Sequence, residues 1–125
     1  VFPTLLRMAG GDPARYQIDG MDIGAVLTEQ AKTPHEEIYW EMEGQTAIRS
    51  GKYKLVLHGK LVEGEPEQDE VFLANLEDDP SEEKNLADQM PALAQELRQK
   101  AESWRTGIEA EWDEKWAHNY TNLTR

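Results

Sequence analysis

The sequence predicts an α+β fold, in which a four-stranded antiparallel sheet packs on one long C-terminal helix and short helices precede the sheet. Two observations carry this prediction. Between residues 36 and 76, short segments of alternating apolar and polar residues are separated by turn-forming residues, which is typical of antiparallel strands. After residue 91, apolar residues recur three and four positions apart, which indicates one buried face of a helix.

The N-terminal part predicts two short helices. Residues 2–9 are mostly apolar, with Pro3 in the first turn and two glycines immediately after the end. Residues 21–29 repeat apolar side chains at helical spacing. We therefore expect two brief helical segments ahead of the sheet.

Four segments alternate as strands do. They are residues 36–42, 45–49, 53–58 and 71–76. A tight hairpin loop at 49–52 joins the second segment to the third, which makes these two strands antiparallel neighbours. Residues 59–70 are polar and rich in turn-forming types, so we expect an irregular excursion there.

The last predicted element is a helix over residues 91–106, whose apolar stripe continues weakly through Ile108 and Trp112. This stripe is expected to cover one face of the sheet. The predicted core combines strand and helix residues: Ile38, Trp40, Ile48, Leu55, Leu57, Phe72, Leu93, Leu97, Ala101 and Trp104. Which face each strand presents to the helix is not determined by the alternation itself.

Composition excludes several classes of function. The 125 residues include 25 acidic and 13 basic side chains, for a net charge of -12. Such a chain repels phosphate backbones and anionic lipid, so we expect neither nucleic-acid nor membrane binding. No apolar run approaches the ~18 residues that would span a bilayer. The absence of cysteine excludes disulfides and thiolate metal sites.

Four segments of the chain carry recognisable motifs: FPTLLRMAG at 2–10, IDGMDIGAVL at 18–27, YWEMEGQTAIRSGKYKLVL at 39–57 and VFLANLEDDPSEEKNL at 71–86. In this order they resemble motifs of the sulfatases, a family of the alkaline phosphatase superfamily. The last is similar to the family's "LYDL-x-x-DP-x-E-x-x-NL" signature near the carboxyl end. The resemblance therefore identifies the chain as a C-terminal piece of a sulfatase, and its start at Val1 rather than methionine agrees with a piece of a longer polypeptide.

The resemblance implies which part of the enzyme performs the reaction and which role this chain has. The whole enzyme would hydrolyse sulfuric esters with a cysteine-derived formylglycine and a divalent cation, usually calcium. This chain has no cysteine and none of the family's upstream metal ligands, so we expect it to contain no catalytic and no metal-binding residue and to be inactive alone. Its role would be to support the catalytic domain and to line the substrate cleft.

The resemblance also implies the domains and partners. Residues 1–30 would be the end of the catalytic domain and a linker, 31–116 the C-terminal α+β subdomain, and 117–125 a flexible tail. The partners would be the N-terminal catalytic domain of the same polypeptide and, for the whole enzyme, a sulfated small molecule or glycan. The sequence assigns no compartment, although the family resemblance is compatible with a periplasmic or extracellular one.

One compact basic cluster, Arg49, Lys52 and Lys54, is the candidate binding site. These cations would contact either an anionic substrate or the catalytic domain; the alternative is a solvated hairpin whose charges pair with acids such as Glu41 and Glu43.

Two other features favour structural interpretations. The acidic run 77–83 lacks the glycine and spacing of a calcium loop and predicts a capped turn that starts a short helix. Tyr39 and Trp40 are interpreted as core residues rather than a platform on which a sugar stacks.

Two alternatives stay open. The parent could be a related phosphodiesterase or phosphonate hydrolase, which the residue at the upstream nucleophile position would decide. The chain could also be a free-standing binding module, although the apolar segment 2–9 argues for a larger domain beside it.

Overall fold

The computed structural model describes residues 1–18, 20–42, 44–59 and 68–112. Most of the predicted excursion at 59–70 and the whole predicted tail at 117–125 lie outside these residues. The chain divides into two compact units, Val1–Glu36 and Glu37–Arg125, and each is described by itself.

The first unit contains the two predicted short helices, α1 (Phe2–Met8) and α2 (Gly24–Glu29), and a 3₁₀ turn at Pro13–Arg15. Buried Thr4 accepts a hydrogen bond from the backbone N–H of Ile23 at 3.0 Å, which fixes the start of α2 against α1. Arg7 adds an ion pair with Asp22 at 2.8 Å. Polar contacts therefore hold this small unit together.

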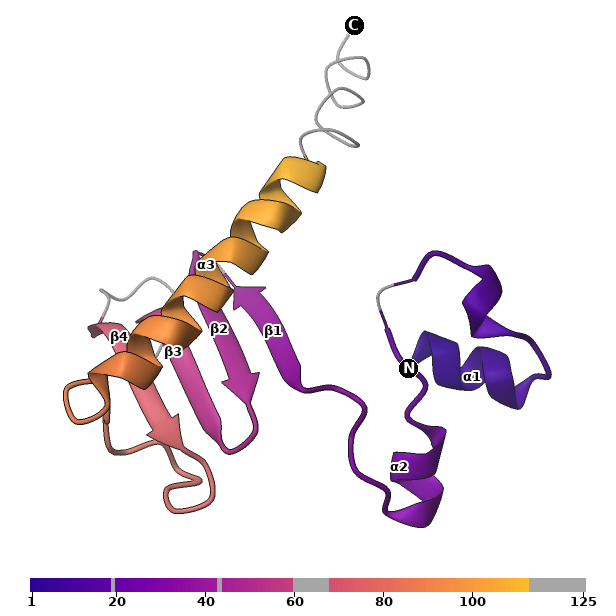
Figure 1. Cartoon of the computed structure of the whole chain (residues 1–125), viewed down its shortest axis with the longest axis horizontal. Coiled ribbons are helices and arrows are strands. Elements are labelled where there is room, and N and C mark those ends of the chain that lie inside the picture. The colour runs from indigo at the N-terminus through magenta and orange to yellow at the C-terminus, as the bar shows by residue number, and fades with distance from the viewer. Residues whose placement is uncertain (19, 43, 60–67, 113–125) are drawn as a thin grey trace, which may run out of the picture. The chain divides into compact units, whose positions relative to one another are not determined.

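The second unit is built on a four-stranded antiparallel sheet, as the sequence predicts, and the strand order is β1-β2-β3-β4 (Figure 1). The strands are β1 (Glu37–Met42), β2 (Gln45–Ser50), β3 (Tyr53–Gly59) and β4 (Asp69–Asn75). Gly51 adopts φ +56° in the turn between β2 and β3, a conformation that glycine allows at little cost. Because the order follows the sequence, β1 and β4 are the two edges of the sheet.

Helix α3 (Pro91–Trp112) crosses one face of this sheet (Figure 1). It extends beyond the predicted end at residue 106, through Gly107 to Trp112. The core between helix and sheet consists of Ile48, Leu55, Leu57, Leu73, Ala94, Leu97 and Ala101, all buried. Five of these were predicted core residues, so the apolar stripe of the helix correctly identified the buried face.

Three predicted core positions are wrong. Ile38 and Trp40 are 45% and 39% exposed, and Phe72 is only partly buried. The register pairs Tyr39 with Ile48, and Ile48 with Leu55, so Tyr39 faces the helix and its neighbours point to the opposite face. Both faces of β1 and β4 carry apolar residues, so alternation alone did not show which face meets α3.

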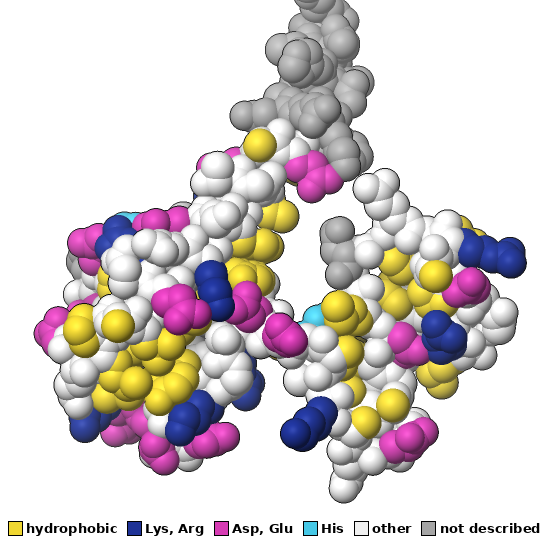
Figure 2. All heavy atoms as spheres, viewed as in Figure 1, with side chains coloured by type: hydrophobic (Ala, Val, Ile, Leu, Met, Phe, Trp, Pro, Cys, Tyr) yellow, Lys and Arg dark blue, Asp and Glu magenta, His cyan; other side chains and the backbone are white. Residues whose placement is uncertain are grey.

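Polar contacts fasten α3 to the edge strand β1. Lys100 contacts Glu37 at 2.6 Å, and Arg105 contacts Glu41 at the same distance. Acidic and basic side chains accordingly lie close together along the helix in the view from its side of the sheet (Figure 2). These pairs orient the helix more than they stabilise it, because partly exposed ion pairs contribute little. Among the described helices, none combines the length and the apolarity that crossing a bilayer requires.

Candidate functional site

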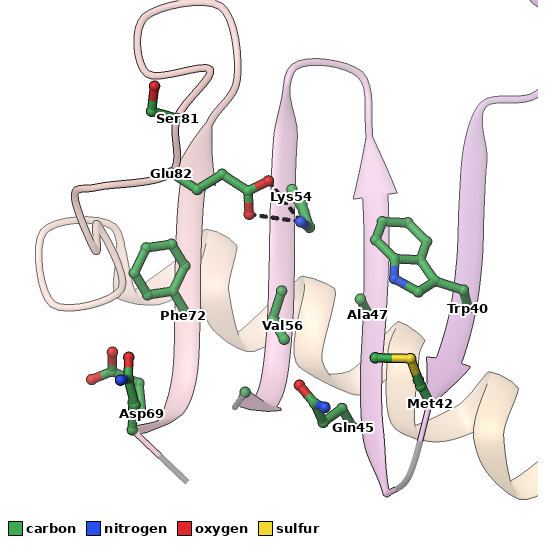
Figure 3. Close-up of a pocket in the computed structure, with 12 residues that line it drawn as sticks. Trp40, Met42, Gln45, Ala47, Lys54, Val56, Asp69, Phe72, Ser81 and Glu82 are labelled. Carbon is green, nitrogen blue, oxygen red and sulfur yellow. Dashed lines mark hydrogen bonds and ion pairs between the residues drawn. The ribbon is translucent and has the colours of Figure 1, made fainter. Parts of the chain in front are cut away.

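The sheet face opposite α3 carries the candidate site. We call it the open face and define it by Ile38, Trp40, Met42, Ala47, Arg49, Lys54, Val56 and Phe72. Cross-strand pairing aligns four of these in one row across the four strands: Trp40, Ala47, Val56 and Phe72. In Figure 3 these side chains lie in front of the strands, and the ribbon of α3 lies behind them. The open face thus has an apolar centre on the side of the sheet away from α3, the helix of this unit.

The open face is hollowed. A concavity of about 450 Å³ is lined by six of its residues, with Glu82 and Asp69 at the rim: Trp40, Met42, Ala47, Lys54, Val56 and Phe72. Met42 is 64% exposed at one end. A mainly apolar concavity is suited to a packed apolar group more than to charge-based catalysis.

A second row on the same face carries positive charge. Arg49 of β2 lies directly opposite Lys54 of β3, with Ile38 of β1 beyond it. Two like charges in such a pair repel each other, and an acidic neighbour relieves this repulsion. Lys54 meets both carboxylate oxygens of Glu82, at 2.6 and 2.7 Å (Figure 3). The Lys54 ammonium also lies 5.6 Å from the centre of the Trp40 ring, within cation–π range.

The structure brings together two of the three residues of the predicted basic cluster. Arg49 and Lys54 share the open face, but Lys52 lies in the turn, where its ammonium is 3.9 Å from Glu77 and 5.5 Å from the Tyr53 ring. Arg49 donates from Nε to the Gly51 carbonyl at 3.2 Å. The solvated-hairpin alternative named Glu41 and Glu43 as acidic partners. Glu41 instead faces α3 and binds Arg105, and Glu43 lies outside the described residues.

The acidic segment 77–83 forms a turn, as predicted, but no helix follows it before α3. Asp79 accepts hydrogen bonds from the backbone N–H groups of Glu83 and Lys84, at 3.2 and 2.9 Å. Glu82 adopts φ +55°, the left-handed region, which interrupts a right-handed helix at this point. The same backbone turn directs the Glu82 carboxylate to Lys54. Sequence reasoning missed this pair because the partners are separated by 28 residues.

Asn85, near the end of the signature segment, ties edge strand β4 to the chain that follows. Its amide oxygen accepts from the N–H groups of Leu73 and Ala87, at 3.1 and 3.0 Å, and its amide nitrogen donates to the Val71 carbonyl at 2.9 Å. Leu86 adds a backbone bond to Leu73 at 2.8 Å and packs against the core. The end of the signature segment therefore anchors the chain after β4 to that edge strand.

The two aromatic residues that the sequence assigned to the core, Tyr39 and Trp40, lie in different environments. Tyr39 is partly buried and stacks on Trp104, whereas Trp40 is half-exposed on the open face. Within the described residues, no three His, Asp or Glu side chains converge to hold a metal ion. Packing and polar recognition are the chemistry that the open face offers.

Comparison with characterised proteins gives a consistent result. Arylsulfatase A from Bos taurus is 27% identical over 122 residues, which covers 79% of this chain and 24% of that protein. Arylsulfatase A from Homo sapiens is 32% identical over 60 residues, covering 43% of this chain and 12% of that protein. No model of a known protein family matches the chain.

Solved structures agree at the level of the fold. A Bacteroides thetaiotaomicron structure from work on glycosaminoglycan metabolism has a TM-score of 0.65 at 24% identity, over 85% of this chain and 24% of its own. A candidate sulfatase from Bacteroides fragilis has a TM-score of 0.58 at 25% identity, over 82% and 23%. A protein solved with its substrate D-glucosamine-2-N,6-O-disulfate has a TM-score of 0.57 at 22% identity, over 86% and 23%. The chain thus spans about a quarter of these proteins, in their C-terminal portion.

Proposed function

We infer that this chain is the C-terminal, non-catalytic part of a sulfatase, a sulfuric ester hydrolase of the alkaline phosphatase superfamily. The match to bovine arylsulfatase A carries this conclusion, since it covers 79% of the chain but 24% of the enzyme. The four sequence segments in family order and the shared α+β fold support it.

The chemistry of the whole enzyme is part of the proposal. A sulfatase requires a formylglycine made from cysteine, and this chain contains no cysteine. Calcium, the cation that the family resemblance implies, would be held by residues outside this chain, because the described residues offer no converging donor set. The chain alone is therefore proposed to be inactive, and a sulfated small molecule or glycan would be the substrate of the full-length enzyme.

Within that enzyme, the chain's role is mechanical and positional. It would hold the catalytic domain of the same polypeptide and border its substrate cleft. A buried core and ion pairs on β1 fasten the sheet to α3, which supports such a role.

The test compares three proteins. The full-length gene product, the 125-residue chain alone and the full-length product without its upstream cysteine are incubated with an aryl sulfate and calcium. We expect turnover by the first only. Hydrolysis of a phosphodiester in place of the sulfate ester, or turnover by the chain alone that persists through repurification, would overturn the proposal.

A further inference from the structure

We propose that the open face is the surface by which this chain docks on the catalytic domain of its own polypeptide. The inference rests on the proposed function and adds to it the particular surface that makes the contact. Four features identify the occupant: the exposure of the open face, its shape, its charge and the length of polypeptide outside these residues.

Exposure and shape indicate a packed partner. On the sheet face away from α3, Ile38 is 45%, Trp40 39% and Met42 64% exposed. Trp40 and Met42 line a concavity together with Ala47 and Val56. An apolar, hollowed surface of this kind is expected to be covered in the assembled protein, since water contact with it is costly.

Charge argues against a sulfated ligand as the occupant. Although Lys54 lies beside the Trp40 ring, both oxygens of Glu82 already meet its ammonium, and Asp69 stands at the rim (Figure 3). A sulfate group would have to displace Glu82 and approach a second carboxylate. An uncharged, apolar protein surface makes contact with the centre of the row without that cost.

Charge also argues against a second copy of the chain. Each copy carries a net charge of -12, so two copies repel each other at long range. A domain of the same polypeptide is instead held nearby at an effective concentration of roughly millimolar by its covalent link. Because the match covers 24% of the bovine enzyme, most of such a polypeptide lies outside these residues and is available as this partner.

The experiment is photo-cross-linking in the full-length protein. Met42, exposed on the open face, is replaced by p-benzoylphenylalanine, and in a matched control the same replacement is made at Gln95, an exposed residue of α3. A mixture of isotopically labelled and unlabelled protein separates links within one polypeptide from links between copies. We expect the Met42 variant to link to the catalytic domain of its own polypeptide and the Gln95 variant to give no such link.

Three results would overturn the inference: links between labelled and unlabelled copies, links only to residues 1–36 of this chain, or equal labelling from both positions. A second measurement uses the unaltered residue, in case the bulky replacement disturbs folding. In hydroxyl-radical footprinting of the full-length protein, Met42 should be oxidised several-fold more slowly than the methionine probe Gln95→Met, and equal rates would contradict docking.

Failure of docking and failure of the proposed function are distinguishable, because aryl sulfate turnover is measured on the same full-length preparation. An active sulfatase with a freely oxidised Met42 refutes the docking surface and leaves the proposed function in place. A protected Met42 that links to the rest of its polypeptide, in a protein that cleaves no sulfate ester, supports docking and refutes the function.

Discussion

Tyr39 of β1 stacks on Trp104 of α3, with ring centroids 5.3 Å apart and ring planes inclined by 15°. The stack joins the edge strand to the helix at a position where the aliphatic core has ended. The Tyr39 hydroxyl donates to Glu37, which also binds Lys100 of the helix. One edge of the sheet is therefore fastened to α3 by an aromatic contact and a polar contact together.

The stack should show a measurable coupling energy. In a double-mutant cycle with Tyr39→Leu and Trp104→Leu, we expect a coupling of about 0.5–1.5 kcal/mol, the range for aromatic pairs beyond their buried area. Urea unfolding of the two single variants and the double variant measures it. Strict additivity of the two single losses would mean that the rings are adjacent without interacting.

Tyr39 should also make stability depend on alkaline pH. Burial, with the hydrogen bond and negative charge of Glu37, raises the pKa of the Tyr39 phenol from 10.0 to about 12. Because the folded-state pKa lies above the unfolded one, the neutral phenol stabilises the fold fully below about pH 10, and this stability is lost as pH rises toward about 12.

Two measurements check this pH dependence. Tyrosinate absorbance should show one of the chain's four tyrosines titrating near 12. Tyr39→Phe, which keeps the stacked ring but cannot ionise, should lose less stability over the same pH interval. An identical decline in both proteins would assign the alkaline sensitivity to other groups, such as Lys100.

Truncation of the helix stripe should destabilise the sheet unit strongly. Leu97 is 1% exposed in the core, and Leu97→Ala is expected to cost about 2–5 kcal/mol of the free energy of unfolding. Gln99→Ala, two residues further along the same helix and exposed, is the control. A urea midpoint that moved equally in the two variants would show that α3 does not cover the sheet.

The signature residue Asn85 should stabilise edge strand β4. Asn85→Ala removes three hydrogen bonds and leaves backbone groups of Val71, Leu73 and Ala87 unpaired, at an expected cost of about 1–3 kcal/mol. Exposed Gln89→Ala serves as the matched control. Amide hydrogen exchange at Leu73 should accelerate in the Asn85 variant, and unaltered exchange would contradict the role.

Much of this fold was predictable from the sequence, because each element has a clear local signal. The period of α3 and the turn at Gly51 placed helix and hairpin correctly, since both depend on near neighbours. The face of β1 was not predictable, because Tyr39 and Trp40 are both apolar enough to be buried and only the register decides between them.

The candidate site was less predictable than the fold. Arg49 and Lys54 were found by their proximity in sequence, but their joint position depends on the strand register. The ion pair between Glu82 and Lys54 was not predictable, because it depends on the left-handed backbone conformation of Glu82 rather than on sequence spacing. Where a charge pair spans distant segments, the sequence contains no local signal for it.

The cations of the hairpin offer the last prediction, in the full-length enzyme. We expect Arg49→Gln and Lys54→Gln to lower the thermal midpoint and to leave KM for an aryl sulfate unchanged, because both lie on the open face that we assign to domain docking. Lys52→Gln is the control: its ion pair with Glu77 is exposed and long, so its loss should change little.

The opposite pattern would change the assignment. If Arg49 or Lys54 touches substrate, its replacement should remove a charge-assisted contact of about 1–3 kcal/mol. KM should then rise by the corresponding factor, with the thermal midpoint unchanged. Unchanged kinetics together with unchanged melting would leave a solvated hairpin. The decisive comparison is therefore between the two readouts in each variant, because docking lowers stability without a change in KM, whereas substrate contact raises KM in a protein that melts as before.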